Sequence, residues 1–295
     1  MRGITIIGPG RIGGALALAL ATAGYRIDSL LYRTRSKATQ ISSKLSPRPE
    51  LRTFASTARI DSPIVFITVQ DGNIAQIALN LLDKITSNAT VFHTSGSLSS
   101  KLLAPLREIG CRVASLHPLA SVSDSETGVD RFKGAYFCLE GDKDAVKLGK
   151  RLVKAVGGTS FEIDPSTKTL YHVAALTAAG HVTALFDIAV SLMTGTGLDR
   201  RQAHKILTPL LTGAAANLAR QDTVTALTGT FARADVETFA RQIEALERAA
   251  TKDEFLVYLE LASRSLDLAE TLGTNLAAID EMRRMISLAK RSIGC

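Results

Sequence analysis

The chain has 295 residues, of which 46% are hydrophobic and 21% charged, so it can form two globular domains and is neither disordered nor fibrous. Its 35 basic and 28 acidic residues give a formal net charge of +7, which favours anionic ligands. Aromatic residues make up only 5%, and no stretch interleaves them with arginine and lysine, so a nucleic-acid partner is not expected.

Cysteine and histidine usage gives no sign of a disulfide framework or a metal site. The three cysteines are odd in number and lack CxxC spacing, which fits a reducing compartment. No pair of histidines has the spacing and acidic partner of a zinc site, so no metal is predicted. The N-terminus lacks the pattern of a secretory signal, and we expect a cytoplasmic protein.

From Met1 to Asp164 the sequence alternates short β-rich runs with helical patterns. Helices are expected over residues 12–23, 74–85 and 145–156. Strands that alternate with helices pair in parallel through right-handed crossovers, which predicts an α/β fold with a Rossmann-like, doubly wound parallel sheet. The predicted strands cover residues 3–7, 27–31, 64–69, 89–92, 113–116 and 135–139.

Beyond Asp164, which is placed to cap a helix starting at Pro165, the pattern is helical over residues 166–194, 200–220, 236–250 and onward. We therefore predict two domains, a Rossmann-like domain over residues 1–164 and an all-α domain over residues 165–295. Residues 173–193 are apolar enough to resemble a membrane span. Because they include Gly180, His181 and Asp187, we interpret them as a core helix buried on most sides, and no membrane partner is expected.

The first strand leads directly into a glycine-rich loop with GxGxxG spacing. Gly8 permits the tight turn, Gly10 lets the backbone approach a pyrophosphate, and Gly13 allows the helix to pack closely on the strand. The helix N-terminus offers free N–H groups to the anion. A dinucleotide site is therefore predicted, formed by Gly8, Pro9, Gly10, Arg11, Ile12 and Gly13.

The end of the second strand indicates which dinucleotide is bound. NAD sites carry a carboxylate there, whereas this sequence has Arg33, Thr34 and Arg35. Guanidinium groups fork onto phosphate oxygens and a hydroxyl donates to them, so these residues favour the 2′-phosphate of NADP. The alternative is an ordinary solvated basic loop.

Three later loops follow predicted strands, where ligands of open parallel sheets bind. We expect Val69 and Gln70, then Ser95 and Gly96, then His117, to face the nicotinamide end of the cofactor. Each has a structural alternative, because such residues also form turns, helix caps and loop histidines held by backbone contacts.

At these residues the chain resembles a family that pairs a Rossmann-like NADP-binding domain with a helical domain labelled DUF2520. The resemblance is carried by the glycine loop and by segments elsewhere in the chain, namely residues 66–71, 93–96, 116–119, 170–172, 226–229 and 232–235. More distantly, the layout is similar to β-hydroxyacid dehydrogenases, ketopantoate reductases and pyrroline-carboxylate reductases. These relatives imply NADP-linked hydride transfer at a C–O or C–N centre and a homodimer formed through the helical domain.

The chain departs from the family pattern at three places. Thr230 stands where the family usually has proline, Ala234 where it has glycine, and Gly180-His181 where it tends to have Ser-Asn. The substrate pocket is expected to differ at these positions.

Lys168 and His172 are four residues apart, so they share one face of the first long helix after Asp164. They resemble the Lys-x-x-x-Asn pair of β-hydroxyacid dehydrogenases and are our candidate catalytic residues, in which either group delivers a proton. The alternative is a surface lysine and a satisfied core histidine. His181 lies on the opposite side of the helix and is interpreted as core or interface.

In the segment 228–235, Thr228 and Arg233 are candidate substrate-binding residues, with Arg233 placed to clamp a carboxylate. Asp235 is interpreted as the cap of the next helix.

The sequence thus predicts an NADP(H)-dependent oxidoreductase that transfers a hydride to a small carbonyl or imine substrate between its two domains. Two alternatives are a non-catalytic NADP(H)-binding sensor and a deazaflavin-linked NADP reductase.

Overall fold

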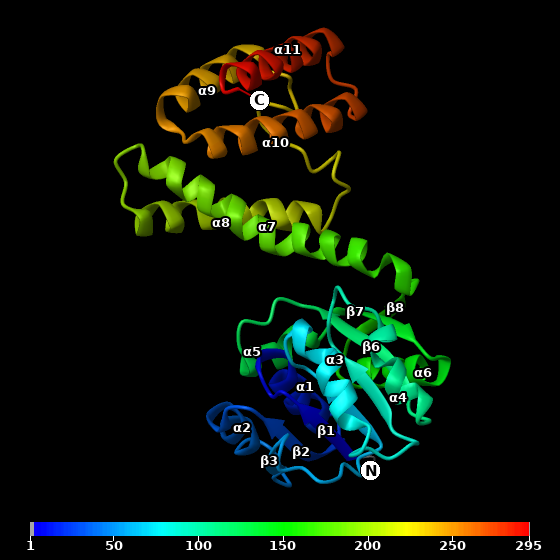
Figure 1. Ribbon diagram of the computed structural model, residues 1–295. Helices are drawn as coiled ribbons and strands as arrows, with labels where there is room; N and C mark the ends of the chain where they lie inside the picture. Colours follow the sequence, from blue (N-terminus) through cyan, green and yellow to red (C-terminus); the bar gives the residue numbers. More distant parts are fainter. Residues whose placement is uncertain (1–2, 295) are drawn as a thin grey trace. The chain divides into compact units, whose positions relative to one another are not determined.

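The computed structural model describes residues 3–294, which divide after Ala179 into two compact units (Figure 1). The first unit holds the sheet and the second is helical. The predicted domain boundary after Asp164 falls before this division, because the first turns of the long helix belong to the sheet-containing unit.

The sheet has eight strands in the order β3-β2-β1-β4-β5-β6-β7-β8. Chain order reverses between β1 and β4, which is the switch point where Rossmann-like sheets leave a crevice at their carboxyl edge. The strands are β1 (Gly3–Ile7), β2 (Arg26–Tyr32), β3 (Glu50–Thr53), β4 (Ile64–Ile67), β5 (Thr90–His93), β6 (Arg112–Leu119), β7 (Tyr136–Gly141) and β8 (Thr159–Glu162).

The helices and the two 3-10 turns η1 and η2 complete the two units. In chain order they are α1 (Arg11–Thr22), α2 (Arg35–Ser42), α3 (Asp71–Leu81), η1 (Ser100–Leu103), α4 (Ala104–Glu108), α5 (Ser125–Phe132), α6 (Lys143–Ala155), η2 (Pro165–Thr167), α7 (Lys168–Thr194), α8 (Arg200–Leu218), α9 (Val236–Ala249), α10 (Lys252–Thr271) and α11 (Leu276–Ser292).

The expected α/β fold is confirmed, with one difference in the pairing of its strands. Strands β6 and β7 are antiparallel, whereas every other neighbouring pair is parallel. The prediction of a wholly parallel sheet was wrong here, because the short helix α5 returns the chain to the same edge. Strands β3 and β8 were not predicted, since their sequences, ELRT and TSFE, are mostly polar, whereas the equally short β4, IVFI, is wholly apolar and β5, TVFH, has an apolar pair at its centre.

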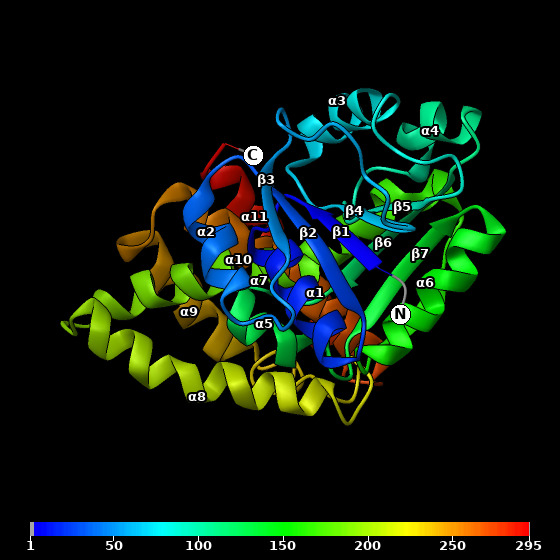
Figure 2. The same cartoon turned by 90° about the horizontal axis from the view of Figure 1, so that it is seen from below.

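Helices cover both faces of the sheet (Figure 2). One face packs against α1, α5 and α6 through a core that includes Leu16, Phe66 and Leu152. The other packs against α3 and α4 through Val65, Ile74 and Leu106. Side chains on a strand alternate between these layers, so the sequence position of a residue fixes which face it serves.

Helices α9, α10 and α11 of the second unit share a core of their own, centred on Phe239, Leu259 and Met282. Asp235 caps α9 by accepting a hydrogen bond from the Thr238 amide, and Asp164 caps η2 in the same way through Ser166, both as predicted. Ala234 has φ +46°, a left-handed conformation that favours glycine, which is the residue that the resemblance leads one to expect there.

Helix α7 is largely exposed in the single chain. Of the described helices, the segment Pro165–Thr194 alone is long and apolar enough to cross a membrane, with mean hydropathy 1.7 over a window that is 6% buried. The prediction of a core helix buried on most sides was therefore wrong, because apolar residues such as Leu170, Val173 and Leu176 are left exposed by the described part of the chain. His181, expected in the core or an interface, is exposed.

The contact between α1 and the glycine loop gives a stability test. A Cβ on Gly13 would lie 2.5 Å from the carbonyl oxygen of Gly8, so we expect Gly13→Ala to lower the free energy of unfolding by about 1–3 kcal/mol. Gly72→Ala serves as the control, because a Cβ there meets nothing within 4 Å. Urea denaturation compares the two, and equal stabilities would contradict the assigned packing.

Candidate functional site

The glycine loop has the geometry that a dinucleotide site requires. Gly8 has φ +90°, and Gly13 faces Thr68 at the end of β4. Gly10 differs from both, since a Cβ on it would meet only the Gly8 carbonyl oxygen, at 3.9 Å, so its outer side is open. No side chain caps the N-terminus of α1, and its first turn contains no acidic residue, which leaves N–H groups for an anion.

The end of β2 carries exposed cations next to the glycine loop. Arg33, Thr34 and Arg35 are all exposed, and no carboxylate pairs with either guanidinium in the part of the chain that the structure describes. Thr34 is the N-cap residue of α2 without a capping side-chain bond. Since neither guanidinium has a side-chain partner among residues 3–294, both remain available to an anionic ligand.

Polar side chains gather on one sheet face at its carboxyl edge. On the α3 and α4 side, the apolar residues Val91 and Val113 are followed, two positions further along their strands, by His93 and Ser115. The antiparallel register sets Glu140 opposite Ser115 and Cys138 opposite His117. Strand alternation therefore puts two successive polar pairs of β6 and β7 on this face.

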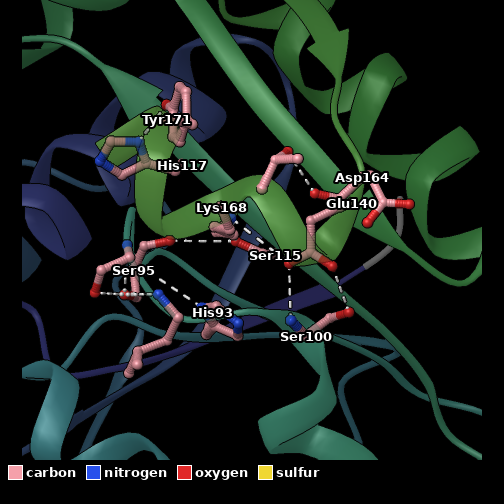
Figure 3. Close-up of polar contacts among 12 residues, drawn as sticks. His93, Ser95, Ser100, Ser115, His117, Glu140, Asp164, Lys168 and Tyr171 are labelled. Atoms are coloured by element: carbon pink, nitrogen blue, oxygen red, sulfur yellow. Dashed lines mark hydrogen bonds and ion pairs between the residues drawn. The ribbon is translucent and has the colours of Figure 1, made fainter. Parts of the chain in front are cut away.

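Lys168, the first residue of α7, extends into this group (Figure 3). Its Nζ donates to the Ser115 hydroxyl at 2.5 Å and lies 3.6 Å from Glu140 Oε1, with both charged side chains 1% exposed. Ser100 donates to both Glu140 oxygens, from its amide at 2.8 Å and its hydroxyl at 2.7 Å. Burial lowers the pKa of Lys168, and the Glu140 carboxylate acts in the opposite direction.

The next turn of α7 lies beside the second polar pair of β6 and β7, which is His117 and Cys138. The Tyr171 hydroxyl lies 2.6 Å from His117 Nδ1, and the imidazoles of His117 and His172 are 6.0 Å apart between centroids. A Cβ on Gly96 would lie 2.8 Å from His117 Nε2 and closer still to His172. Gly96 is thus the point at which the backbone at the end of β5 passes beneath both rings.

The loop after β5 is held by an acidic residue of α3. Asp71 accepts hydrogen bonds from the hydroxyls of Ser95 at 2.8 Å and Ser97 at 2.9 Å. The Ser95 amide donates to His93 Nδ1 at 3.2 Å. Burial, and next the charge of Lys168, lower the pKa of His93 to about 4, so this ring is neutral at pH 7.

Several sequence-predicted residues converge in the first unit. Ser95, Gly96, His117, Lys168 and His172 lie together, and Val69 borders Gly8 of the glycine loop. Gln70 is exposed and is the N-cap residue of α3.

Other predicted residues are placed apart from this group or in an unexpected setting. Thr228 and Arg233 are exposed in the second unit and stay predictions as substrate-binding residues. Lys168 is not a surface lysine, since its Nζ is enclosed by Ser115 and Glu140. His172 is partly exposed.

Sequence reasoning missed Glu140, Ser115 and the role of Tyr171. The available signal was a carboxylate next to the apolar run Phe137–Leu139 of β7, because an ionised group on such a strand requires a cation or hydrogen-bond donors nearby. Among residues 3–294, no group of three or more His, Cys, Asp or Glu side chains is placed to hold a metal ion.

The fold places the chain among Rossmann-like α/β proteins that continue into a helical region. Residues 2–118 match the Rossmann-like domain, and residues 135–265 match DUF2520, a domain of unknown function. The sequence thus matches both domains that its motifs predicted, one after the other along the chain. A search of the curated proteins found no match.

Solved structures with the same fold include three that are named as oxidoreductases or reductive enzymes. A candidate NADP oxidoreductase from Bacteroides fragilis is 20% identical, with a TM-score of 0.73 over 90% of this chain and 98% of its own. An imine reductase from Pseudomonas sp. is 18% identical, with a TM-score of 0.61 over 96% and 99%. A reductive aminase from Aspergillus terreus, solved with NADPH and ethyl levulinate, is 19% identical, with a TM-score of 0.56 over 99% and 94%.

The buried ion pair gives a second stability test. We expect Glu140→Gln and Lys168→Met each to lower the free energy of unfolding by about 3–5 kcal/mol, because each leaves a buried charge without its partner. The double variant should lose less than the sum of the single losses, since it removes both charges.

Urea denaturation of the four proteins measures this coupling. The exposed pair Glu237 and Arg241, substituted in the same way, is the control and should show little coupling. Losses at Glu140 and Lys168 that simply add would show that the two groups do not depend on each other.

Proposed function

We propose that the chain is an NADP(H)-dependent oxidoreductase that transfers a hydride to a small carbonyl or imine compound. One observation carries the proposal: an open glycine loop lies beside unpaired arginines, and the carboxyl edge of the same sheet also bears the polar group around His117. The three solved structures, named as an NADP oxidoreductase, an imine reductase and a reductive aminase, support this class.

The glycine loop fits the cofactor. Gly8, Gly10 and the N-terminus of α1 would hold the pyrophosphate, while Arg33 and Arg35 would bind the 2′-phosphate. The bound dinucleotide would supply the hydride to the substrate carbon.

The chain's own residues would position the substrate and supply polar contacts to the reacting group. His117 and His172 are the partly exposed polar rings at the edge, so we assign contact with the substrate to them. Lys168 has its Nζ enclosed, and we assign it to supporting His117 through its charge and through the attachment of α7. The candidate proton donors among the side chains are therefore the two imidazoles that border the Gly96 backbone, those of His117 and His172.

We propose in addition that the chain acts as a homodimer through α7 and α8. Helix α8 buries only Ala203 among its residues, and its Ile206, Leu210 and Leu218 are each more than half exposed. An open groove of about 610 Å³ between α7 and α8 includes Phe186 and Val190 in its lining. Exposed apolar side chains of this kind are typical of an interface, and a second copy would cover them.

Nucleotide titration tests the cofactor assignment. We expect micromolar NADPH binding, and Arg33→Ala/Arg35→Ala should weaken it about 100-fold, because two charge-assisted contacts to one phosphate are lost. NADH, which lacks the 2′-phosphate, should bind both proteins equally.

The control variant Arg131→Ala/Arg151→Ala removes the same charge from two exposed helix positions in the first unit and should bind NADPH as the wild type does. Absence of binding by the wild type would end the proposed function. Binding without NADPH oxidation across a panel of carbonyl and imine compounds would instead favour a non-catalytic NADP(H) sensor.

Sedimentation velocity tests the dimer. We expect Leu210→Glu/Leu218→Glu to raise the dimer dissociation constant about 100-fold or more, since each leucine buried at an interface contributes roughly 1.5–3 kcal/mol. Leu288→Glu, an exposed leucine of α11, is the control and should leave the dimer intact. A wild-type monomer would contradict the proposal, and a monomer that binds lipid vesicles would assign the apolar surface to a membrane.

A further inference from the structure

Tyr171 makes a contact that the proposed function does not use. It lies three residues after Lys168 on α7, so the two side chains share a face of the helix and meet successive pairs of the β6–β7 ladder. Its hydroxyl contacts His117 Nδ1 at 2.6 Å and the thiol of Cys138, the residue opposite His117. All of these residues belong to the first unit.

The direction of the Tyr171–His117 hydrogen bond follows from the chemistry of the three groups. A phenol O–H is a better donor than a thiol, and an imidazole nitrogen is a better acceptor than sulfur. Burial raises the pKa of Tyr171, so its hydroxyl keeps its proton at neutral pH. Tyr171 therefore donates to His117 Nδ1, and the single proton of the neutral ring lies on Nε2.

The groups around His117 keep its ring neutral. Burial first, then the charge of Lys168 and the neighbouring ring of His172, lower the pKa of His117 to about 4, and Asp71 acts in the opposite direction. The titratable groups that face it come from four elements and are Lys168, Tyr171 and His172 of α7, Asp71 of α3, His93 of β5 and Cys138 of β7.

The Nε2 atom of His117 is available to a ligand. It makes no hydrogen bond within the described residues, and it is not enclosed as His93 Nε2 is, which is the buried and unpartnered side-chain atom there. It lies over Gly96. Because glycine has no side chain, this position leaves room for both imidazoles.

We propose that Tyr171 is a positioning residue that fixes His117 as the Nε2–H tautomer, and that His117 thereby selects substrates whose reacting group carries a lone pair. Such groups are a carbonyl oxygen or a neutral imine nitrogen. The proposal rests on the proposed function, because it takes His117 as the contact of the reacting group.

The substrate preference follows from one donor and one nearby cation. An N–H donor bonds a carbonyl oxygen and stabilises the negative charge that hydride addition places there, and the alkoxide then takes a proton from solvent water to give the alcohol. A permanently charged iminium ion offers no lone pair to Nε2–H, and it would bring a second positive charge near Lys168. The site therefore favours carbonyl compounds and neutral imines over quaternary iminium ions.

Nitrogen NMR of the ¹⁵N-labelled protein tests the tautomer without turnover, with the His117 signals identified by their loss in His117→Gln. We expect the wild type to carry its proton on Nε2 at pH 7 and to stay neutral down to about pH 5. Tyr171→Phe should give a mixture of tautomers and a pKa raised toward the ordinary value of ~6.5, because the neutral form loses its hydrogen bond.

Tyr136→Phe is the matched control, since it removes an exposed tyrosine hydroxyl from β7 and should leave both readouts unchanged. A proton on Nδ1 in the wild type would overturn the proposal, as would a Tyr171→Phe spectrum identical to that of the control. The wild-type spectrum alone decides the tautomer if Tyr171→Phe does not fold.

Substrate comparison tests the selectivity, with NADPH oxidation followed for matched cyclic ketones, neutral imines and N-methyl iminium salts. Reduction of the first two classes at least about 100-fold faster than the third is expected. Preferential reduction of the iminium salts would overturn the proposal and leave the oxidoreductase assignment intact. Reduction of none of them by a protein with the expected tautomer would overturn the proposed function and the selectivity with it.

Discussion

The buried ion pair of Lys168 and Glu140 is the interaction on which the candidate site depends. It fixes the first turn of α7 against β6 and β7, and Tyr171 and His172 reach His117 only from that position. Two charges withdrawn from water are tolerated because Ser115 and Ser100 complete their hydrogen bonds. The same cation then influences chemistry beyond its own contacts, since it helps to keep His93 and His117 uncharged.

The features that the sequence predicted well are those encoded locally. The glycine loop, the caps at Asp164 and Asp235 and six strands were recognisable, because each depends on a few neighbouring residues. The direction of β7 was not recognisable, since a strand's partner and orientation are set by contacts distant in sequence. The pairing of Lys168 with Glu140 was missed for the same reason, because the sequence shows both residues but not that they are in contact.

The exposed surface of α7 and α8 shows a different limit of sequence reasoning. An apolar helix predicts burial but does not say which molecule covers it, and here the single chain leaves Leu210 and Leu218 exposed. The prediction of a core helix took the covering partner to be the chain itself. A homodimer would reconcile the composition of α7 with its exposure, because the apolar residues would then be buried between copies.

The antiparallel ladder of β6 and β7 also determines how the site can fail. Ser115 and His117 face α7, whereas Leu116 between them faces the core beneath α1 and α6. A slip of β6 by one residue would exchange these roles, bringing leucine to the first turn of α7 and sending the imidazole into hydrocarbon. The register of β6 against β7 therefore determines the candidate site as well as the fold. A chain with the wrong register would lose the polar group around His117 and the packing of Leu116 together.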